Sequence, residues 1–366
     1  MNVLITGSDG FIGKNLTFKL LELGVKVLKF NRNNNIDDLM ELVKNADFIM
    51  HLAGENRPKD NKEFIKSNIN LTHEVCRCVS HFEKKIPIAF ASSIQADDDS
   101  PYGNSKKQAE EVLKSFGLKN KSKVYIYRLP GVFGKWCKPN YNSVVATFCY
   151  NTVNGHPLNI HSPYKKVQLI YIDDLITNFV NLISDTKSNH DLIISPQYEI
   201  SIKELATKIS RFKSSRDDLF VDDLGEGLTK KLYSTYISYF KPNDFSYSYS
   251  RFEDSRGIFS EIVKSSKSGQ LSYFSINPGE IRGNHYHHTK TEKFYVIDGS
   301  VVFKYMNILS GENYEVTIHA NDCRAIESIP GWAHSLINNT HEKAIVILWS
   351  NEIFDKVKPD TFNFKI

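Results

Sequence analysis

Apolar and polar positions follow a regular pattern along the first 130 residues. Short apolar runs lie at positions 3–5, 25–30, 48–51 and 86–91, and amphipathic or polar segments separate them. Apolar runs of this length are typical of buried strands, and strands that alternate with helical segments indicate a parallel sheet. The pattern therefore predicts an α/β fold here, with helices on both faces of a doubly wound parallel sheet.

The pattern changes near residues 239–250. The segment Lys241-Pro242-Asn243-Asp244 and an alternation of Ser and Tyr interrupt the earlier periodicity, as expected of a junction between domains. Beyond it, short apolar runs with turn residues between them predict an all-β barrel. A chain of 366 residues is also too long for one ordinary core. We therefore expect two domains, residues 1–242 and 243–366.

Composition narrows the class of function. The formal net charge is +4 and no block of Lys and Arg stands out, so nucleic-acid binding is not implied. Five cysteines without a CxxC pair favour reduced thiols in a cytoplasmic protein. No apolar run approaches the length of a membrane helix, so membrane insertion is not expected.

Three glycines lie between the first apolar run and the helix predicted to follow it, at Gly7, Gly10 and Gly13. Glycine permits a tight turn and a close approach of the backbone to a pyrophosphate at a helix N-terminus. The spacing is GxxGxxG instead of GxGxxG, and a purely structural turn is the alternative. The position between a strand and a helix favours dinucleotide binding.

The end of the second apolar run bears on the choice of dinucleotide. An NAD enzyme usually places an acidic side chain there, which accepts hydrogen bonds from the ribose 2′-hydroxyl. Here the run ends in Lys29-Phe30-Asn31-Arg32, and a guanidinium can pair with a 2′-phosphate. We therefore expect NADPH, with Asn31 and Arg32 at its ribose; an arginine in a solvated loop is the alternative.

A candidate catalytic set follows the fourth apolar run, which ends in Ser92-Ser93 and precedes Pro101-Tyr102-Gly103-Asn104-Ser105-Lys106. On a helix, Tyr102 and Lys106 lie one turn apart on the same face. An ammonium beside the phenol is expected to lower the pKa of Tyr102 from about 10. With Ser93, these residues could stabilise the oxygen that forms when hydride is added to a ketone or removed from an alcohol.

A candidate metal site lies in the second domain, in the segment 279–299, GEIRGNHYHHTKTEKFYVIDG. In a strand, His285 and His287 point to the same face, and Glu292 begins the next expected strand. His334 follows a tight bend further on. Three imidazoles and a carboxylate suit one divalent transition metal, with zinc as the expected ion. A histidine-rich surface hairpin is the alternative.

Residues 1 to about 240 resemble the extended short-chain dehydrogenases/reductases, through TGSDGFIG, HLAG, Asn68, Ser93, Tyr102-x-x-x-Lys106 and Arg128 in RLPGVFG. The resemblance implies a Rossmann-type fold, catalysis by Ser93, Tyr102 and Lys106, and a substrate contact by Arg128. It also implies a cofactor site made of Gly7, Asp9, Gly10, Phe11, Ile12, Gly13, Asn31, Arg32, Leu52, Ala53, Gly54, Asn68, Tyr102 and Lys106. Sugar-nucleotide dehydratases of this family have Thr-Asp-Glu where this chain has Ser93-Ile94-Gln95, which, with Arg32, indicates a reductase.

The offsets between Gly279, His285, His287, Glu292 and Gly299, and those in Pro330-Gly331-x-x-His334-x-x-x-Asn338, resemble the two motifs of the cupin family. Residues 251–261 and 282–286 also resemble the cupin-type epimerases of nucleotide-linked 4-keto deoxysugars. In those enzymes the arginines at the positions of Arg256 and Arg282 hold nucleotide phosphates, and the histidine at the position of His285 takes a proton beside the ketone.

This chain departs from those epimerases, which lack the second histidine and commonly have a lysine where Glu292 stands. If a metal is bound, His285 is expected to be a ligand, and the base must come from elsewhere. Tyr295, Lys304 and His319 are the candidates.

An extended reductase followed by a metal cupin resembles the CapF-type enzymes of bacterial capsule and O-antigen synthesis over the whole chain. The resemblance implies a UDP-2-acetamido-2,6-dideoxy-hexos-4-ulose as substrate, with C3 epimerised in the cupin and the C4 ketone reduced with NADPH. The product would be UDP-N-acetyl-6-deoxy-L-talosamine, and a homodimer is expected. Three alternatives stay open: a reductase with the cupin as a dimerisation module, a regulatory sensor of NADPH, and an iron cupin dioxygenase fused to a reductase.

Overall fold

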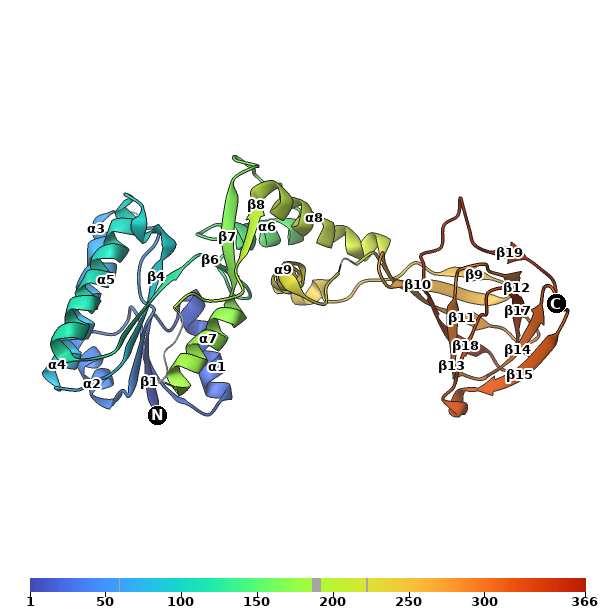
Figure 1. The fold of residues 1–366 in the computed structure, drawn as a ribbon, viewed down its shortest axis with the longest axis horizontal. Coiled ribbons are helices and arrows are strands. Elements are labelled where there is room, and N and C mark those ends of the chain that lie inside the picture. The colour runs from blue at the N-terminus through green and yellow to red at the C-terminus, as the bar shows by residue number, and fades with distance from the viewer. Residues whose placement is uncertain (59, 186–191, 222) are drawn as a thin grey trace. The chain divides into compact units, whose positions relative to one another are not determined.

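The computed structural model describes residues 1–58, 60–185, 192–221 and 223–366. The chain forms two compact units (Figure 1). The first contains residues 1–209 and 231–239, and the second contains residues 210–230 and 240–366.

The first unit is built on a five-stranded parallel sheet, in the order β2-β1-β3-β4-β5. Its strands are β1 (Asn2–Thr6), β2 (Lys26–Phe30), β3 (Phe48–His51), β4 (Ile88–Ser93) and β5 (Val124–Leu129). A second, three-stranded sheet contains β6 (Gly131–Phe133), β7 (Lys166–Tyr171) and β8 (Tyr198–Ser201). The predicted α/β architecture with a Rossmann-type parallel sheet is confirmed.

Helices cover both faces of the parallel sheet, because successive strand residues point in opposite directions. Val3 and Ile5 of β1 pack in one core with α1 (Phe11–Glu22) and α7 (Ile172–Ser184). Leu4 packs in another core. That core includes residues of α2 (Ile36–Asn45), α4 (Leu71–His81) and α5 (Pro101–Asn120). Figure 1 shows these two groups of helices on opposite sides of the sheet.

Short helical segments precede α4 and α5. They are α3 (Lys62–Phe64), the π-helix η1 (Ile65–Asn70) and the 3-10 helix η2 (Ile94–Asp97). The remaining helices are α6 (Val144–Val153), α8 (Ile202–Asp218), α9 (Gly227–Ile237) and the 3-10 helix η3 (Pro242–Asp244).

The start of α5 fixes where Tyr102 lies. Ser100 is the N-cap, and its Oγ accepts a hydrogen bond of 3.0 Å from the N–H of Gly103. Pro101 occupies the first helical turn, where its missing N–H costs no hydrogen bond. The cap places Tyr102 in the first turn of α5 and Lys106 one turn later, as the spacing predicted.

The second unit contains two antiparallel sheets with a shared core. One has the order β16-β13-β18-β11-β10-β9, and the other β15-β14-β17-β12-β19. Buried residues from both sheets, among them Phe294, Phe303, Ile318, Leu336 and Val346, form the core. The predicted all-β, cupin-like domain is confirmed.

The strand bounds of the second unit are β9 (Phe252–Asp254), β10 (Gly257–Ser265), β11 (Gly269–Ile276), β12 (Ile281–Tyr286), β13 (Glu292–Asp298), β14 (Ser300–Asn307), β15 (Asn313–His319), β16 (Ala325–Glu327), β17 (Trp332–Ile337), β18 (Ala344–Ser350) and β19 (Phe362–Asn363). A 3-10 helix, η4 (Ala320–Asp322), follows β15.

The division between the units differs from the single boundary predicted at 242/243, because residues 210–230 group with the second unit. The guanidinium of Arg216 donates to the carbonyl of Asp244 and lies 4.0 Å from the ring centroid of Phe240. The N–H of Lys264, in β10, donates to the carbonyl of Leu219. These contacts tie the segment to the chain on the far side of the expected junction.

Candidate functional site

The three predicted glycines form the turn between β1 and α1. Gly7 has a φ of +72°, and a Cβ there would lie 2.8 Å from backbone atoms of Ala53. A Cβ on Gly13 would lie 2.2 Å from the carbonyl oxygen of Gly7. Glycine is therefore required for the backbone of this turn to pack against itself and against the segment after β3. Gly10 is the N-cap of α1, so no side chain covers the N–H groups to which an anion could bind.

Ser93 and Tyr102 meet at the carboxyl end of the parallel sheet. Ser93 is the last residue of β4, Tyr102 lies in the first turn of α5, and their hydroxyl groups are hydrogen-bonded. The neighbouring Ser92 instead donates a hydrogen bond of 2.6 Å to Glu110, because adjacent strand residues point to opposite sides. This geometry supports Ser93, and not Ser92, as the candidate catalytic serine.

Lys106 is buried beside this pair, with 6% of its surface exposed. Its Nζ donates a hydrogen bond of 2.9 Å to the carbonyl of Ala91 and lies 4.7 Å from the ring centroid of Phe90. Burial lowers the pKa of Lys106 to about 8, and the charge of Glu110 opposes the shift.

One expectation about Tyr102 was wrong. Its pKa is raised, because burial disfavours the phenolate, and the hydrogen bond with Ser93 only partly opposes this. The expected lowering assumed that the Lys106 ammonium would face the phenol. In this structure the ammonium is instead directed to the Ala91 carbonyl.

Gly54 and Asn68 lie next to Lys106. A Cβ on Gly54 would lie 3.0 Å from Asn68 Oδ1 and 3.1 Å from Lys106 Nζ. Asn68, in η1, is buried and donates to the Glu55 carbonyl (3.0 Å) and to Ser105 Oγ (2.8 Å). Its Oδ1 accepts from the N–H of Glu55. The structure therefore brings these two predicted cofactor residues to the lysine of the catalytic set.

Glu55 is a residue of this site that sequence reasoning missed. Its carboxylate forms an ion pair with Arg32 and accepts hydrogen bonds from the Tyr141 hydroxyl (2.5 Å) and the N–H groups of Asn56 and Arg57. Burial would raise the pKa of Glu55, but the hydrogen bonds and the charge of Arg32 lower it below its usual value. An acidic residue directly after HLAG was the available signal.

Arg128 is already held by two carboxylates. Its guanidinium makes two hydrogen bonds to Glu110, of 2.9 and 2.8 Å, and two of 2.8 Å to Asp97. These bonds occupy Nε, Nη1 and Nη2 and fix the end of β5 to α5. A substrate contact by Arg128 stays a prediction, and it would have to compete with these carboxylates.

The four predicted metal ligands come together inside the second unit. One ligand atom each of His285, His287, Glu292 and His334 lies within 4.8 Å of the others. His285, in β12, pairs with His334, in β17, across the sheet. Glu292 begins β13, and its Oε2 lies 3.2 Å from His287 Nε2 and 3.4 Å from His334 Nε2. The N–H groups of Ser328 and Gly331 donate to the carbonyls of Glu292 and His287, and these bonds hold the bend before His334 in place.

The chemistry of this set fits a divalent metal. The Nδ1 of His287 is hydrogen-bonded to the carbonyl of Asp360, so its Nε2 faces the other ligands. Burial and the neighbouring His334 lower the pKa of His285 to about 3, and a neutral imidazole is the form that binds metal. Within the described residues, the buried Nδ1 of His334 has no hydrogen-bond partner. Imidazole nitrogens and a carboxylate oxygen are among the ligands that bind zinc in tetrahedral sites.

Lys290 is a second residue that sequence reasoning missed. It is buried, and its Nζ lies 3.0 Å from Oε1 of Glu292. The bases considered from the sequence lie elsewhere: Tyr295 and Lys304 alternate along β13 and β14 with the core residues Phe294 and Phe303, and His319 is exposed. Strand alternation therefore directs Tyr295 and Lys304 away from the barrel interior.

Arg256 and Arg282 lie close enough to influence each other. Arg282, in β12, donates to the carbonyls of Ser275 (3.0 Å) and Ile258 (3.3 Å). Burial and the charge of Arg256 lower the pKa of Arg282. Arg256 pairs with Asp254 at 2.6 Å. The structure thus brings together the two arginines that the resemblance assigned to phosphates.

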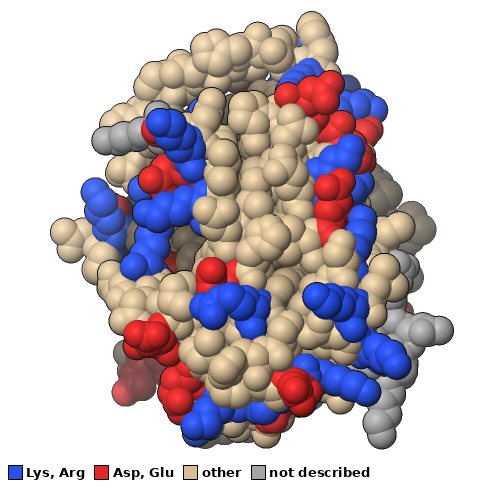
Figure 2. All heavy atoms as spheres, turned by 90° about the vertical axis from the view of Figure 1, so that its left-hand side faces the viewer, with Lys and Arg blue, Asp and Glu red and all other residues tan. Residues whose placement is uncertain are grey.

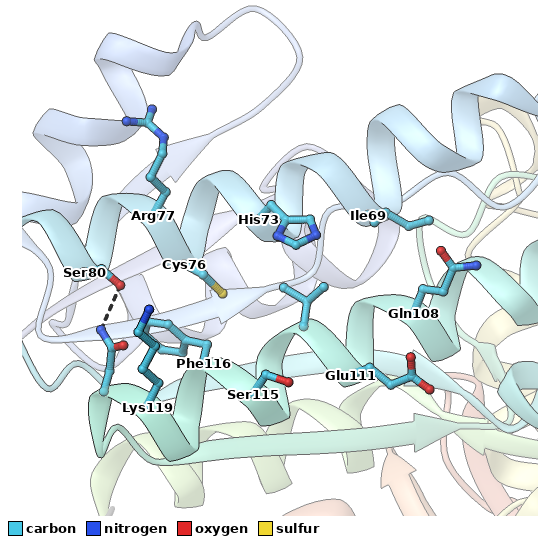
Figure 3. Close-up of a pocket in the computed structure, with 12 residues that line it drawn as sticks. Ile69, His73, Cys76, Arg77, Ser80, Gln108, Glu111, Ser115, Phe116 and Lys119 are labelled. Atoms are coloured by element: carbon cyan, nitrogen blue, oxygen red, sulfur yellow. Dashed lines mark hydrogen bonds between the residues drawn. The ribbon is translucent and has the colours of Figure 1, made fainter.

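A groove of about 600 Å³ lies away from these sites, between α4 and α5. Figure 3 labels His73 of α4 and Gln108 and Glu111 of α5 among the residues that line it. Its lining contains none of the predicted site residues. On the side of the molecule shown in Figure 2, Lys and Arg side chains lie among Asp and Glu side chains. Among the described helices, none has the length and apolarity that a membrane span requires.

The first unit matches a known protein family. Residues 3–195 match the model of the NAD dependent epimerase/dehydratase family. The chain belongs to this family. The family match includes the glycine turn, Glu55, the Ser93–Tyr102–Lys106 set and Arg128. Residues 252–362 match a second model, the polysaccharide biosynthesis C-terminal domain. This range includes both arginines, the four predicted metal ligands and Asp360.

The similarity of this epimerase/dehydratase family member to known proteins covers both units. The chain is 44% identical over 364 residues to UDP-2-acetamido-2,6-beta-L-arabino-hexul-4-ose reductase of Pseudomonas aeruginosa, which covers 99% of this chain and 98% of the relative. It is similar over the full length of both chains to the crystal structure of the capsular polysaccharide assembling protein CapF from Staphylococcus aureus, with a TM-score of 0.92 and 36% identity. The predicted similarity to CapF-type proteins is confirmed.

A more distant likeness concerns the fold of the first unit alone. UDP-glucuronic acid 4-epimerase from Bacillus cereus, in complex with NAD, matches 65% of this chain with a TM-score of 0.55 and 18% identity. Membership of the NAD dependent epimerase/dehydratase family implies a nicotinamide cofactor for this protein.

Proposed function

We propose that this protein is a bifunctional UDP-sugar enzyme that acts on a UDP-2-acetamido-2,6-dideoxy-hexos-4-ulose. The second unit epimerises C3, and the first unit reduces the C4 ketone with NADPH to give UDP-N-acetyl-6-deoxy-L-talosamine for capsule or O-antigen synthesis. One observation carries the proposal: two chemically distinct sites lie in a chain that is 44% identical, over nearly its whole length, to a reductase of such a UDP-sugar.

The first unit has the residues that a ketone reduction needs. NADPH, when bound, supplies the hydride. Tyr102 donates its hydroxyl proton to the C4 oxygen as hydride adds to C4, so that the ketone becomes an alcohol. The hydrogen bond with Ser93 orients this hydroxyl group. The buried Lys106 ammonium, which the Ala91 carbonyl holds next to Gly54, adds a positive charge to the site at which negative charge develops on the oxygen.

The second unit has the residues for a nucleotide-linked ketone. The paired guanidinium groups of Arg256 and Arg282 bind the diphosphate. His285, His287, Glu292 and His334 hold the metal, which supplies Lewis acidity beside the ketone or keeps the ligand strands in place.

The two reactions have a fixed order. The C3 proton can be removed near neutral pH only while the adjacent C4 ketone delocalises the resulting charge as an enolate. Reduction at C4 destroys that ketone, so epimerisation must come first. Reduction of one epimer then draws the mixture of epimers onward by mass action.

The proposal is tested by incubating the enzyme with the UDP-4-keto sugar in deuterated water, with and without NADPH, and following the sugar by NMR. Without NADPH, deuterium should enter C3 and two epimers should appear. With NADPH, the C4-reduced epimer should accumulate. A C4-reduced, unepimerised sugar that the enzyme then converts to the final product would overturn this order.

A second candidate is a UDP-4-keto-sugar reductase in which the cupin is a dimerisation or binding module. The name of the Pseudomonas aeruginosa relative, which gives a reductase activity alone, favours it. Reduction without any deuterium at C3 would select this candidate.

A further inference from the structure

Asp360 gathers hydrogen bonds from the loop that connects two of the metal ligands. Its carboxylate accepts from the N–H groups of His288 (3.0 Å), Thr289 (2.7 Å) and Lys290 (2.7 Å), and from the Thr289 hydroxyl (3.0 Å). Three consecutive N–H groups of the loop between His287 and Glu292 therefore converge on one side chain about 70 positions later in the chain.

The same residue contacts one flanking ligand directly and is linked to the other through Lys290. The Asp360 carbonyl is hydrogen-bonded to Nδ1 of His287, which leaves Nε2 of His287 facing the ligand cluster. On the other side, Lys290, whose N–H is bound to Asp360, places its Nζ 3.0 Å from Oε1 of Glu292. Because Oε1 contacts Lys290, the other oxygen of Glu292, Oε2, faces His287 and His334.

The C-terminal segment that contains Asp360 is itself fixed to the strand of the first ligand. In the short strand β19, Phe362 pairs with Tyr286, and Asn363 pairs with His285. The rings of Phe362 and Tyr286 stack with centroids 5.3 Å apart. The N–H of Phe364 donates to the carbonyl of Asn284. The position of Asp360 therefore follows from pairing with β12.

We propose that Asp360 is a positioning residue for the metal site, which fixes the loop 288–290 and thereby aims His287 and Glu292 at one ion. The inference rests on the metal site of the proposed function. A loop that is ordered before the ion arrives does not have to be ordered by it, so the conformational entropy of the loop does not oppose binding. Partners that orient metal ligands typically change metal affinity by about 10–100-fold.

The test compares Asp360→Ala, Asp360→Asn and Asp355→Ala in the full-length protein. Asp355 lies in the same C-terminal segment and accepts hydrogen bonds from the N–H groups of Val357 and Lys358, so its replacement disturbs a turn but leaves the loop contacts. Asparagine keeps a carbonyl oxygen that can accept from Thr289 and Lys290 but loses the carboxylate. Zinc affinity is measured by competition with a chromogenic chelator, and hydrogen exchange of the amides of 288–290 is measured in the metal-free proteins.

Asp360→Ala should bind zinc about 10–100-fold more weakly than wild type, Asp360→Asn should fall in between, and Asp355→Ala should match wild type. In the metal-free proteins, the amides of 288–290 should exchange faster in Asp360→Ala than in Asp355→Ala. Wild-type zinc affinity in Asp360→Ala, or equal weakening in Asp355→Ala, would overturn the positioning role. A wild-type protein that binds no zinc would instead overturn the metal site on which the inference rests.

Discussion

The guanidinium of Arg32, just after β2, forms an ion pair with the carboxylate of Glu55, which follows β3. The Arg32 side chain is 87% exposed, whereas that of Glu55 is 11% exposed and is held by Tyr141 and two backbone N–H groups. The cation expected at a 2′-phosphate therefore already has a fixed anionic partner. Because Arg32 is the exposed member, it can turn toward a phosphate while Glu55 stays in place.

Arg32→Asp should shift the cofactor preference from NADPH toward NADH. A carboxylate repels a 2′-phosphate and accepts from a 2′-hydroxyl. Loss of a hydrogen bond to a charged group costs about 1.5–3 kcal/mol, so the kcat/KM ratio of NADPH to NADH should fall by roughly ten- to hundredfold. Lys26→Asp, the same charge change at the exposed start of β2, is the control. An unchanged ratio would mean that Arg32 is a solvated loop residue.

Tyr102→Phe should abolish NADPH oxidation and leave deuterium exchange at C3 of the keto sugar intact. The proposed proton donor for C4 lies in the first unit, whereas the proposed metal ligands lie in the second. Removal of a general acid typically lowers a rate by about 10²–10⁴-fold. Tyr164→Phe removes the same hydroxyl group at an exposed position and should have no effect. Loss of exchange together with reduction would contradict the two-site proposal.

The reductase rate should fall as the pH rises through about 8, because burial lowers the pKa of Lys106 to about 8 and the ammonium is lost above it. The unfolded chain keeps this proton up to a pH of about 10.4. The unfolded state therefore binds more protons between these two values, and the contribution of Lys106 to the free energy of unfolding should increase with pH over this window. A profile of kcat against pH checks the first effect and denaturant titrations check the second. A rate that stays constant to pH 10 would contradict the role of the ammonium.

Protein isolated without chelators should contain one zinc ion per chain, and His287→Ala or His334→Ala should lose it. Each variant removes one of four converging ligands. His341→Ala is the matched control, because it also removes an imidazole, at an exposed position outside the ligand cluster. Elemental analysis gives the metal content of each protein. Wild type without metal would end this prediction, and iron with oxygen consumption would favour the dioxygenase alternative.

Features that depend on neighbours in the chain could be predicted from the sequence. The glycine turn, the helical spacing of Tyr102 and Lys106, and the strand spacing of His285 and His287 each lie within a few residues. The period of a helix or a strand sets such relationships locally. Strand bounds shifted by only a residue or two, as where β4 runs over Ile88–Ser93 instead of 86–91.

The tertiary structure alone decided the partners and the electrostatics of these residues. Glu55 contacts Arg32, Asp360 contacts His287, and Glu110 contacts Arg128. The residues of each pair are far apart in the chain, so the period of a helix or a strand does not predict these contacts. The pKa of Tyr102 rises instead of falling because burial, which depends on everything packed around the ring, outweighs what a nearby charge would suggest. The amino-acid sequence thus determined which chemical groups are present and at what local spacing, and folding determined which distant groups face them and how little water reaches them.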